Sequence, residues 1–158
     1  MSKMRLIAVT LFSLALSACG GVDQIVERQC PEIDVLATAD SWRSGDVTAQ
    51  LTSAQLTCFI DRDTDDLLAD IKLQGTISES GVDVPFFIAS LNKEDGVINR
   101  VQYQVKVGQT AFVYELPRYK YGARSALADK PRLVAGFVLT PAQLAANRTA
   151  YRKRLGMQ

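Results

Sequence analysis

The residues of this chain that could do chemistry fall into three groups: a basic stretch rich in tyrosine, a run of aspartates, and three cysteines. Histidine is absent from the sequence. The Ser-His-Asp and Cys-His nucleophile arrangements, histidine-bearing zinc sites and the usual general base at neutral pH are therefore excluded. This absence favours a binding or structural role over catalysis, and no cofactor is predicted.

The basic stretch covers residues 117–132 and contains one acid, Asp129. Cations beside flat aromatic rings can hold anions such as peptidoglycan carboxylates, lipid head groups or an acidic protein face. We therefore predict an anion- or partner-binding site in the first half of the stretch, the alternative being a surface loop with solvated charges. The residues of the predicted site are Arg118, Tyr119, Lys120, Tyr121 and Arg124.

The aspartate run, residues 61–66, places carboxylates at every second position, as calcium-binding loops do. An EF-hand loop also needs glycine at its sixth position and glutamate at its twelfth, where this chain has Asp66 and Lys72. We therefore predict an acidic turn between two strands and no metal site. The other carboxylates show no spacing that singles out two of them for glycoside hydrolysis.

The first cysteine, Cys19, follows a segment with the order of a secretory signal peptide. Lys3 and Arg5 form the basic region, residues 6–16 are largely apolar, and small residues precede the cysteine. The apolar part is shorter than the about 20 residues that a transmembrane helix needs. We predict that residues 1–18 are cleaved and take no part in the fold.

The residues around the predicted cleavage site, Leu16-Ser17-Ala18-Cys19, resemble the bacterial lipobox. The resemblance implies that the Cys19 sulfur takes a diacylglycerol and that the new amino group is acylated, so that acyl chains such as palmitate anchor the protein. The alternative is an ordinary signal peptide in which Cys19 is incidental. The residue after Cys19 is Gly20 and not aspartate, which favours a lipid-anchored protein of the outer membrane that faces the periplasm.

Removal of residues 1–18 leaves 140 residues and lowers the formal charge from +1 to −1, because Lys3 and Arg5 are lost. A chain of this length suits one domain with its own core. Its charge gives no reason to expect nucleic acid as a partner. We predict a lipidated tether over residues 19–29 and one domain over residues 30–158, and the short tether predicts a domain close to the membrane.

The other two cysteines, Cys30 and Cys58, are an even pair in a compartment that permits disulfides. A bridge between them closes a loop of 28 residues along the chain, for which the entropy model gives about 3 to 4 kcal/mol. The alternative is a pair of buried free thiols. Two sulfurs fall short of the four ligands of a structural zinc site.

The alternation of apolar and polar residues predicts a mainly β fold, a single antiparallel β-sandwich-like domain of about seven strands, with a barrel as the alternative. A parity change within Thr48–Ile60 predicts a bulge near Thr52 or Ser53. Pro85 cannot donate to a ladder, so it is predicted at an edge or a bulge. The predicted strands are Ile33–Ala37, Thr48–Ile60, Leu67–Ile77, Val82–Leu91, Val97–Val107, Thr110–Leu116 and Arg132–Leu139.

A C-terminal helix is predicted from about Pro141 to Arg154. Thr140 suits the N-cap, proline suits the first helical position, and Gln143 completes a capping box. Leu144, Tyr151 and Leu155 recur on one helical face, and cations gather in the last turns, where they suit the helix dipole.

The mature chain resembles a group of uncharacterised proteobacterial lipoproteins. The shared features are Cys19, Cys30-Pro31, Cys58, Val84-Pro85-Phe86-Phe87 and the segment GFVLTPAQLAANR at residues 136–148. The resemblance implies one domain and an envelope address, and it carries over no site residues.

We expect a non-enzymatic envelope module, anchored to the membrane through lipid on Cys19, whose partner is an envelope protein or a cell-wall polymer. The alternatives are an accessory glycan hydrolase that uses carboxylates and an inhibitor of an exported enzyme.

Overall fold

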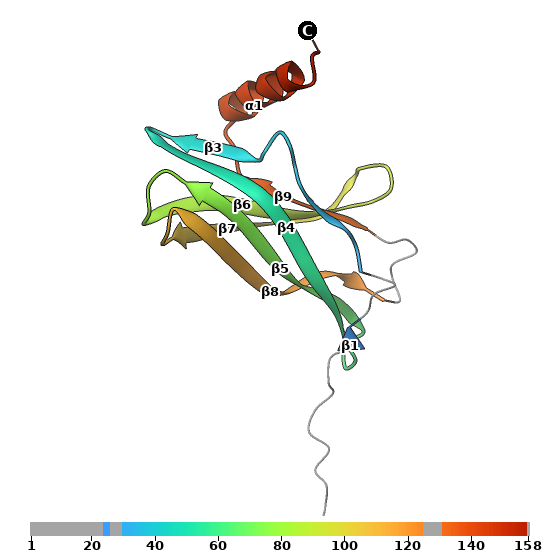
Figure 1. Cartoon of the computed structure of the whole chain (residues 1–158). Helices are drawn as coiled ribbons and strands as arrows, with labels where there is room; N and C mark the ends of the chain where they lie inside the picture. Colours follow the sequence, from blue (N-terminus) through green and yellow to red (C-terminus); the bar gives the residue numbers. More distant parts are fainter. Residues whose placement is uncertain (1–23, 26–29, 125–130, 158) are drawn as a thin grey trace, which may run out of the picture.

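The computed structural model describes residues 24–25, 30–124 and 131–157 (Figure 1). The predicted lipidation site, Cys19, lies outside these residues. The strands are β1 (Gln24–Ile25), β2 (Ile33–Val35), β3 (Ser41–Ser44), β4 (Val47–Asp61), β5 (Asp66–Ile77), β6 (Val82–Leu91), β7 (Val97–Val107), β8 (Ala111–Ala123) and β9 (Arg132–Phe137), followed by the helix α1 (Pro141–Arg154). The predicted mainly β fold with a C-terminal helix is confirmed.

The strands form two sheets that pack face to face as a sandwich. Sheet A has the order β1-β4-β5-β8, with β3 also paired to β4, and sheet B has the order β2-β9-β6-β7. Neighbouring strands are antiparallel except β2 and β9, which are parallel. Residues of both sheets meet in one hydrophobic core, as expected when each strand turns alternate side chains inward.

The core depends on the alternation that predicted the strands. On β5 every second residue from Leu67 to Ile77 is buried, and the residues between them are partly or fully exposed. Sheet B supplies Phe86, whose ring lies 5.0 Å from that of Phe137 and 5.9 Å from that of Phe112 on β8. This aromatic cluster joins the two sheets across the core.

A disulfide between Cys30 and Cys58 also joins the sheets. Cys30 lies just before β2 of sheet B, Cys58 lies on β4 of sheet A, and their Cα atoms are 5.5 Å apart. Cys58 is 1% exposed, so its sulfur is part of the core. The predicted pairing is confirmed.

One local prediction, the bulge on β4, is also confirmed. The register of β4 against β5 shifts between Leu51 and Ser53, which is the predicted bulge. The β6–β7 turn, residues 92–96, has Asp95 at φ 60°. The Asn92 side-chain oxygen accepts from the backbone nitrogens of Glu94 and Gly96 at 3.1 and 2.6 Å, so local hydrogen bonds fix the turn.

The structure corrects the placement of Pro85. We predicted an edge or a bulge, but β6 is an inner strand of sheet B. The pairing of β6 with β9 begins at Phe86, directly after the proline, and the Pro85 oxygen still accepts from the Val138 nitrogen at 2.8 Å. Pro85 therefore lies just beyond the end of the β6–β9 ladder, so no hydrogen bond inside that ladder needs the N–H that proline lacks.

The sandwich is elongated, and its ends differ. Strand β1 lies within the segment predicted as a tether, and it pairs with Phe59 and Ile60 near the end of β4. Helix α1 stands at the opposite end, beside β3 (Figure 1). Phe59 and Ala49 lie ten residues apart on β4, which at about 3.3 Å per residue is roughly 33 Å.

Within the described part of the chain, no helix is long and apolar enough to cross a membrane.

Candidate functional site

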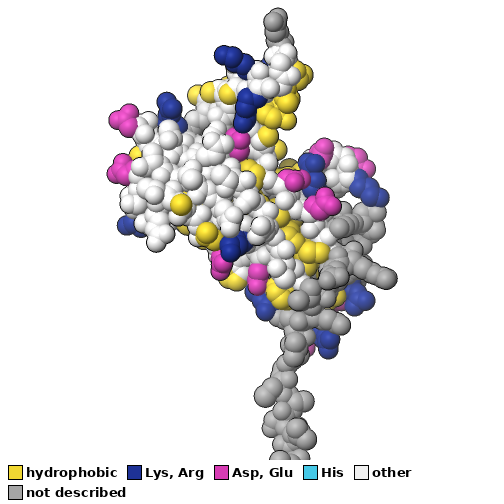
Figure 2. Space-filling model, viewed as in Figure 1, with side chains coloured by type: hydrophobic (Ala, Val, Ile, Leu, Met, Phe, Trp, Pro, Cys, Tyr) yellow, Lys and Arg dark blue, Asp and Glu magenta, His cyan; other side chains and the backbone are white. Residues whose placement is uncertain are grey.

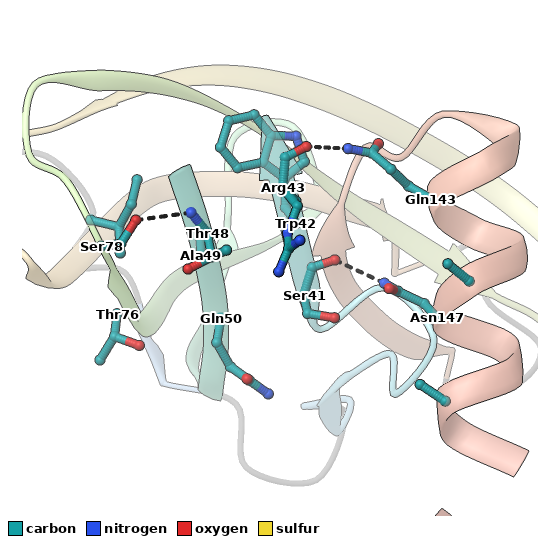
Figure 3. Close-up of a pocket in the computed structure, with 13 residues that line it drawn as sticks. Ser41, Trp42, Arg43, Thr48, Ala49, Gln50, Thr76, Ser78, Gln143 and Asn147 are labelled. Atoms are coloured by element: carbon teal, nitrogen blue, oxygen red, sulfur yellow. Dashed lines mark hydrogen bonds between the residues drawn. The ribbon is translucent and has the colours of Figure 1, made fainter. Parts of the chain in front are cut away.

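A cleft of about 710 Å³ lies between helix α1 and the outer face of sheet A at the end remote from β1. We call it the helix cleft. The strands contribute Ser41, Trp42, Arg43, Thr48, Ala49, Gln50, Thr76, Ile77 and Ser78, and the helix contributes Gln143, Ala146, Asn147 and Ala150 (Figure 3).

The sheet wall of the helix cleft is polar because of strand alternation. Ser41 pairs with Gln50, which pairs with Thr76, and this row points away from the core. The next row, Trp42, Ala49 and Ile77, points inward, and Trp42 is partly buried against the main core. The cleft therefore presents hydroxyl and amide groups of the outer row, while the tryptophan ring closes the end of the core beneath them.

The helix wall is positioned by its first turn. The Thr140 nitrogen donates to the Gln143 side-chain oxygen at 2.8 Å, and the Thr140 hydroxyl accepts from the Gln143 nitrogen at 3.3 Å, which is the predicted capping box. The amide nitrogen of the Gln143 side chain donates to the backbone oxygen of Arg43 on β3. Gln143 thus starts the helix and ties it to the sheet.

Asn147 makes the second connection, one turn further on. Its side-chain nitrogen donates to the backbone oxygens of Ser41 at 2.8 Å and Thr38 at 3.2 Å. Near the helix end, Arg154 lies 3.6 Å from the Asp40 carboxylate and 3.3 Å from the Ala37 oxygen. No residue of the helix is buried. Polar contacts of Gln143, Asn147 and Arg154 therefore connect the helix to the sandwich.

The chemistry of the helix cleft suits binding. Its described lining offers hydroxyls, the Gln50 amide and the exposed guanidinium of Arg43 beside apolar groups such as Trp42 and Ala146, and contains no carboxylate, thiol or amine. The amide nitrogens of Gln143 and Asn147 are already engaged in docking the helix. Hydroxyl and amide groups both donate and accept hydrogen bonds, and a guanidinium holds a carboxylate in a fork. General acid–base catalysis needs a group that titrates near the working pH, and the lining supplies none.

The predicted basic site lies elsewhere, at the other end of sheet A. The strand predicted to end at Leu116 continues to Ala123, because Pro117 and Arg118 form a bulge between two paired stretches. Arg118 has φ 56°. Its backbone nitrogen donates to the Asp70 carboxylate at 2.8 Å, and its guanidinium lies 4.5 Å from the centre of the Phe59 ring.

The tyrosines of the predicted site face the core, because they alternate with the cations along β8. Tyr119 and Tyr121 are 4% and 3% exposed. The Tyr119 hydroxyl lies 3.2 Å from that of Ser90, within hydrogen-bond distance. Burial raises the pKa of Tyr119, an effect that the Ser90 hydrogen bond opposes, and burial raises the pKa of Tyr121 to about 12. Neither ring forms an exposed aromatic surface beside the cations.

The cations of this site have acidic neighbours across the sheet. Lys120 lies 2.7 Å from the Asp66 carboxylate, and this hydrogen bond lowers the pKa of Asp66. Among the described residues, Arg124 is connected to the same region by its backbone only, because its backbone nitrogen donates to the Asp65 backbone oxygen at 2.9 Å. A groove of about 450 Å³ separates this part of β8 from β7. Anion binding by these residues stays a prediction.

The aspartate run forms the turn between β4 and β5. The Asp61 carboxylate accepts from the backbone nitrogen of Asp63 at 2.9 Å, and Asp65 takes a left-handed conformation at φ 59°. Within residues 24–25, 30–124 and 131–157, no three His, Cys, Asp or Glu side chains are grouped to hold a metal ion. These aspartates shape a turn.

Comparisons of this chain with protein-family models, curated proteins and solved structures find no match. The candidate site therefore rests on the geometry alone. Sequence reasoning missed it because its walls come from three distant segments, residues 41–50, 76–78 and 143–150. The one local signal was Gln143, noted for the capping box only.

Proposed function

We propose that this chain is a lipid-anchored outer-membrane lipoprotein that binds the glycan–peptide polymer of the cell wall in the helix cleft, without turning it over. The proposal combines the predicted lipid anchor on Cys19 with the helix cleft, which lies at the end of the sandwich opposite β1. It keeps the expected partner class, a cell-wall polymer, and assigns it a place on the molecule.

The composition of the helix cleft carries the proposal. A cell-wall polymer offers sugar hydroxyls, amides and carboxylates, which match the hydroxyl, amide and guanidinium groups of the cleft. The alternative of a glycan hydrolase needs two carboxylates on either side of the scissile bond. Because the described lining has no carboxylate, a binding role is favoured.

The position of the helix cleft supports the same proposal. Gln24 of β1 follows Cys19 by five residues, which fully extended span at most about 18 Å. The β1 end is therefore the end near the anchor. The cleft lies roughly 33 Å further along β4, so a lipid-anchored protein would present it away from the membrane surface.

Co-sedimentation of the purified, detergent-solubilised lipoprotein with isolated cell-wall sacculi tests the proposal. Ala146 lines the helix cleft and is exposed, so Ala146→Trp fills the cleft with little demand on the fold. We expect this variant to bind sacculi about tenfold more weakly or worse, a loss of at least about 1.4 kcal/mol.

Ala145→Trp is the matched control, because Ala145 is the adjacent exposed residue of the same helix and does not line the cleft. It should bind as the unmodified protein does. Equal binding by both variants, or no binding by the unmodified protein, would overturn the proposal. Release of soluble glycan fragments during the incubation would favour the hydrolase instead.

A further inference from the structure

The outer face of sheet B is apolar over part of β6 and β9, although the outer face of a sandwich sheet normally carries polar residues. On β6, the residues from Phe86 to Leu91 are all buried, so the side chains on both faces of this strand are shielded from solvent. Phe87, Ala89 and Leu91 form a second hydrophobic cluster with Val134 of β9 and Ala39. This cluster is separate from the core between the sheets.

The cluster forms the floor of a hollow of about 330 Å³, which we call the sheet B hollow. Its walls include Leu36 before β3, Val97 on β7 and Leu144 on helix α1. Leu36 and Val97 are 37% and 64% exposed. The volume is at the lower end of the about 300 to 1,000 Å³ typical of small-molecule sites.

Two arginines are the only charged residues in the described lining of the hollow: Arg100 from β7 and Arg148 from α1. Arg100 on β7 is paired with Ala89 on β6, which is part of the floor. The guanidinium of Arg100 lies 4.6 Å from the centre of the Phe87 ring. In the part of the chain that the structure describes, neither arginine forms an ion pair with a carboxylate. An apolar floor beside two cations is complementary to an anionic amphiphile.

We propose that the sheet B hollow binds a fatty acid, with the acyl chain on the Phe87–Leu91 floor and the carboxylate held by Arg100 and Arg148. The site is distinct from the helix cleft. Gln143, Ala146, Asn147 and Ala150 of α1 face the cleft, whereas Leu144 and Arg148 face the hollow. The two sites thus lie on two faces of the same helix and share no lining residue.

Photolabelling of the full-length lipoprotein in phosphatidylcholine nanodiscs tests the proposal. The probe is a 16-carbon fatty acid with a diazirine in its chain, and the comparison probe is the alcohol with the same chain. We expect the acid to label peptides that contain residues 36–39, 87–91 or 144. The alcohol should label them at least about fivefold less, because a hydroxyl cannot form the charge-assisted hydrogen bonds that a carboxylate forms with the two guanidinium groups.

The variants Arg100→Gln and Arg148→Gln should each lower labelling by the acid at these peptides several-fold. Lys106→Gln is the matched control, because Lys106 is an exposed cation on the same strand as Arg100 and does not line the hollow. Labelling that is unchanged in both arginine variants, equal for the acid and the alcohol, or confined to other peptides would overturn the proposal. Crosslinks between two copies of the chain at the hollow would overturn it as well.

Discussion

The Asn147 side-chain nitrogen donates to the Ser41 backbone oxygen at 2.8 Å, joining helix α1 to a strand 106 positions earlier in the chain. With its second bond to Thr38, this one amide satisfies two carbonyls that would otherwise need water. Because no residue of the helix is buried, such contacts decide whether the helix cleft keeps its shape.

Asn147→Ala should therefore loosen the helix without unfolding the sandwich. Each hydrogen bond is worth about 0.5 to 1.5 kcal/mol, so we expect faster hydrogen exchange in residues 143–154 and unchanged exchange in β4 to β6. Thr149→Ala is the control, because the Thr149 hydroxyl donates to the Ala145 backbone oxygen of its own helix. Equal exchange in the two variants would show that Asn147 does not hold the helix in place.

Reduction of the Cys30–Cys58 disulfide should destabilise the domain. The bridge closes a separation of 28 residues and ties β2 to β4, so its loss should lower the free energy of unfolding by about 3 to 4 kcal/mol. Urea unfolding of oxidised and reduced protein measures the difference. A change below about 1 kcal/mol would mean that the packing of β2 against β4 suffices without the bridge.

The buried tyrosines predict a loss of stability at high pH. Burial raises the pKa of Tyr121 from 10.0 to about 12, so the folded protein holds this proton more tightly than the unfolded chain. The stabilising contribution is complete below pH 10 and is lost as the pH rises towards 12. Urea unfolding between pH 8 and 12 should show this fall, and Tyr121→Phe should make it shallower. An identical slope in the variant would assign the loss to other groups.

Lipid on Cys19 should be what holds the protein on the membrane. Cys19→Ser removes the sulfur that the lipobox resemblance assigns to the diacylglycerol, so we expect the variant to leave the salt-washed membrane fraction or to be mislocalised. Cys30→Ser combined with Cys58→Ser should stay with the membrane. If the Cys19→Ser variant stays there after the wash, another feature anchors the protein.

The strands that could be predicted from the sequence are those with long, regular alternation. Strands β5 and β7 and helix α1 match their predictions closely, because one-sided burial and the Thr140 capping box are local signals. Strand β6 also has its predicted bounds, although Phe86 to Leu91 are buried on both of its faces. Strands β1 and β3 were missed because each contains a single apolar residue, which shows no alternation. Strand β8 was predicted to end at Leu116, because its alternation breaks at a bulge that only the partner strand β5 defines.

The candidate site could be predicted far less well than the fold. The cations on β8 were recognisable by type, but their pairing with Asp66 and Asp70 depends on the register of β5 against β8. The helix cleft depends on where α1 stands, which is set by hydrogen bonds from Gln143 and Asn147 to distant backbone oxygens. No periodicity in the sequence encodes such contacts. The basic side chains of the helix end, visible in Figure 2, were predicted as a feature of the helix dipole and not as part of a site.

The most direct test of cell-wall binding is photocrosslinking in living cells from a position inside the helix cleft. A photoreactive amino acid at Ala150, which lines the cleft, is compared with the same residue at Ala145, which does not. Mass spectrometry after muramidase digestion then identifies what is attached. We predict muropeptides on the protein labelled at position 150 and none on the protein labelled at position 145. Muropeptides at neither position, or equally at both, would contradict binding of the cell wall in this cleft.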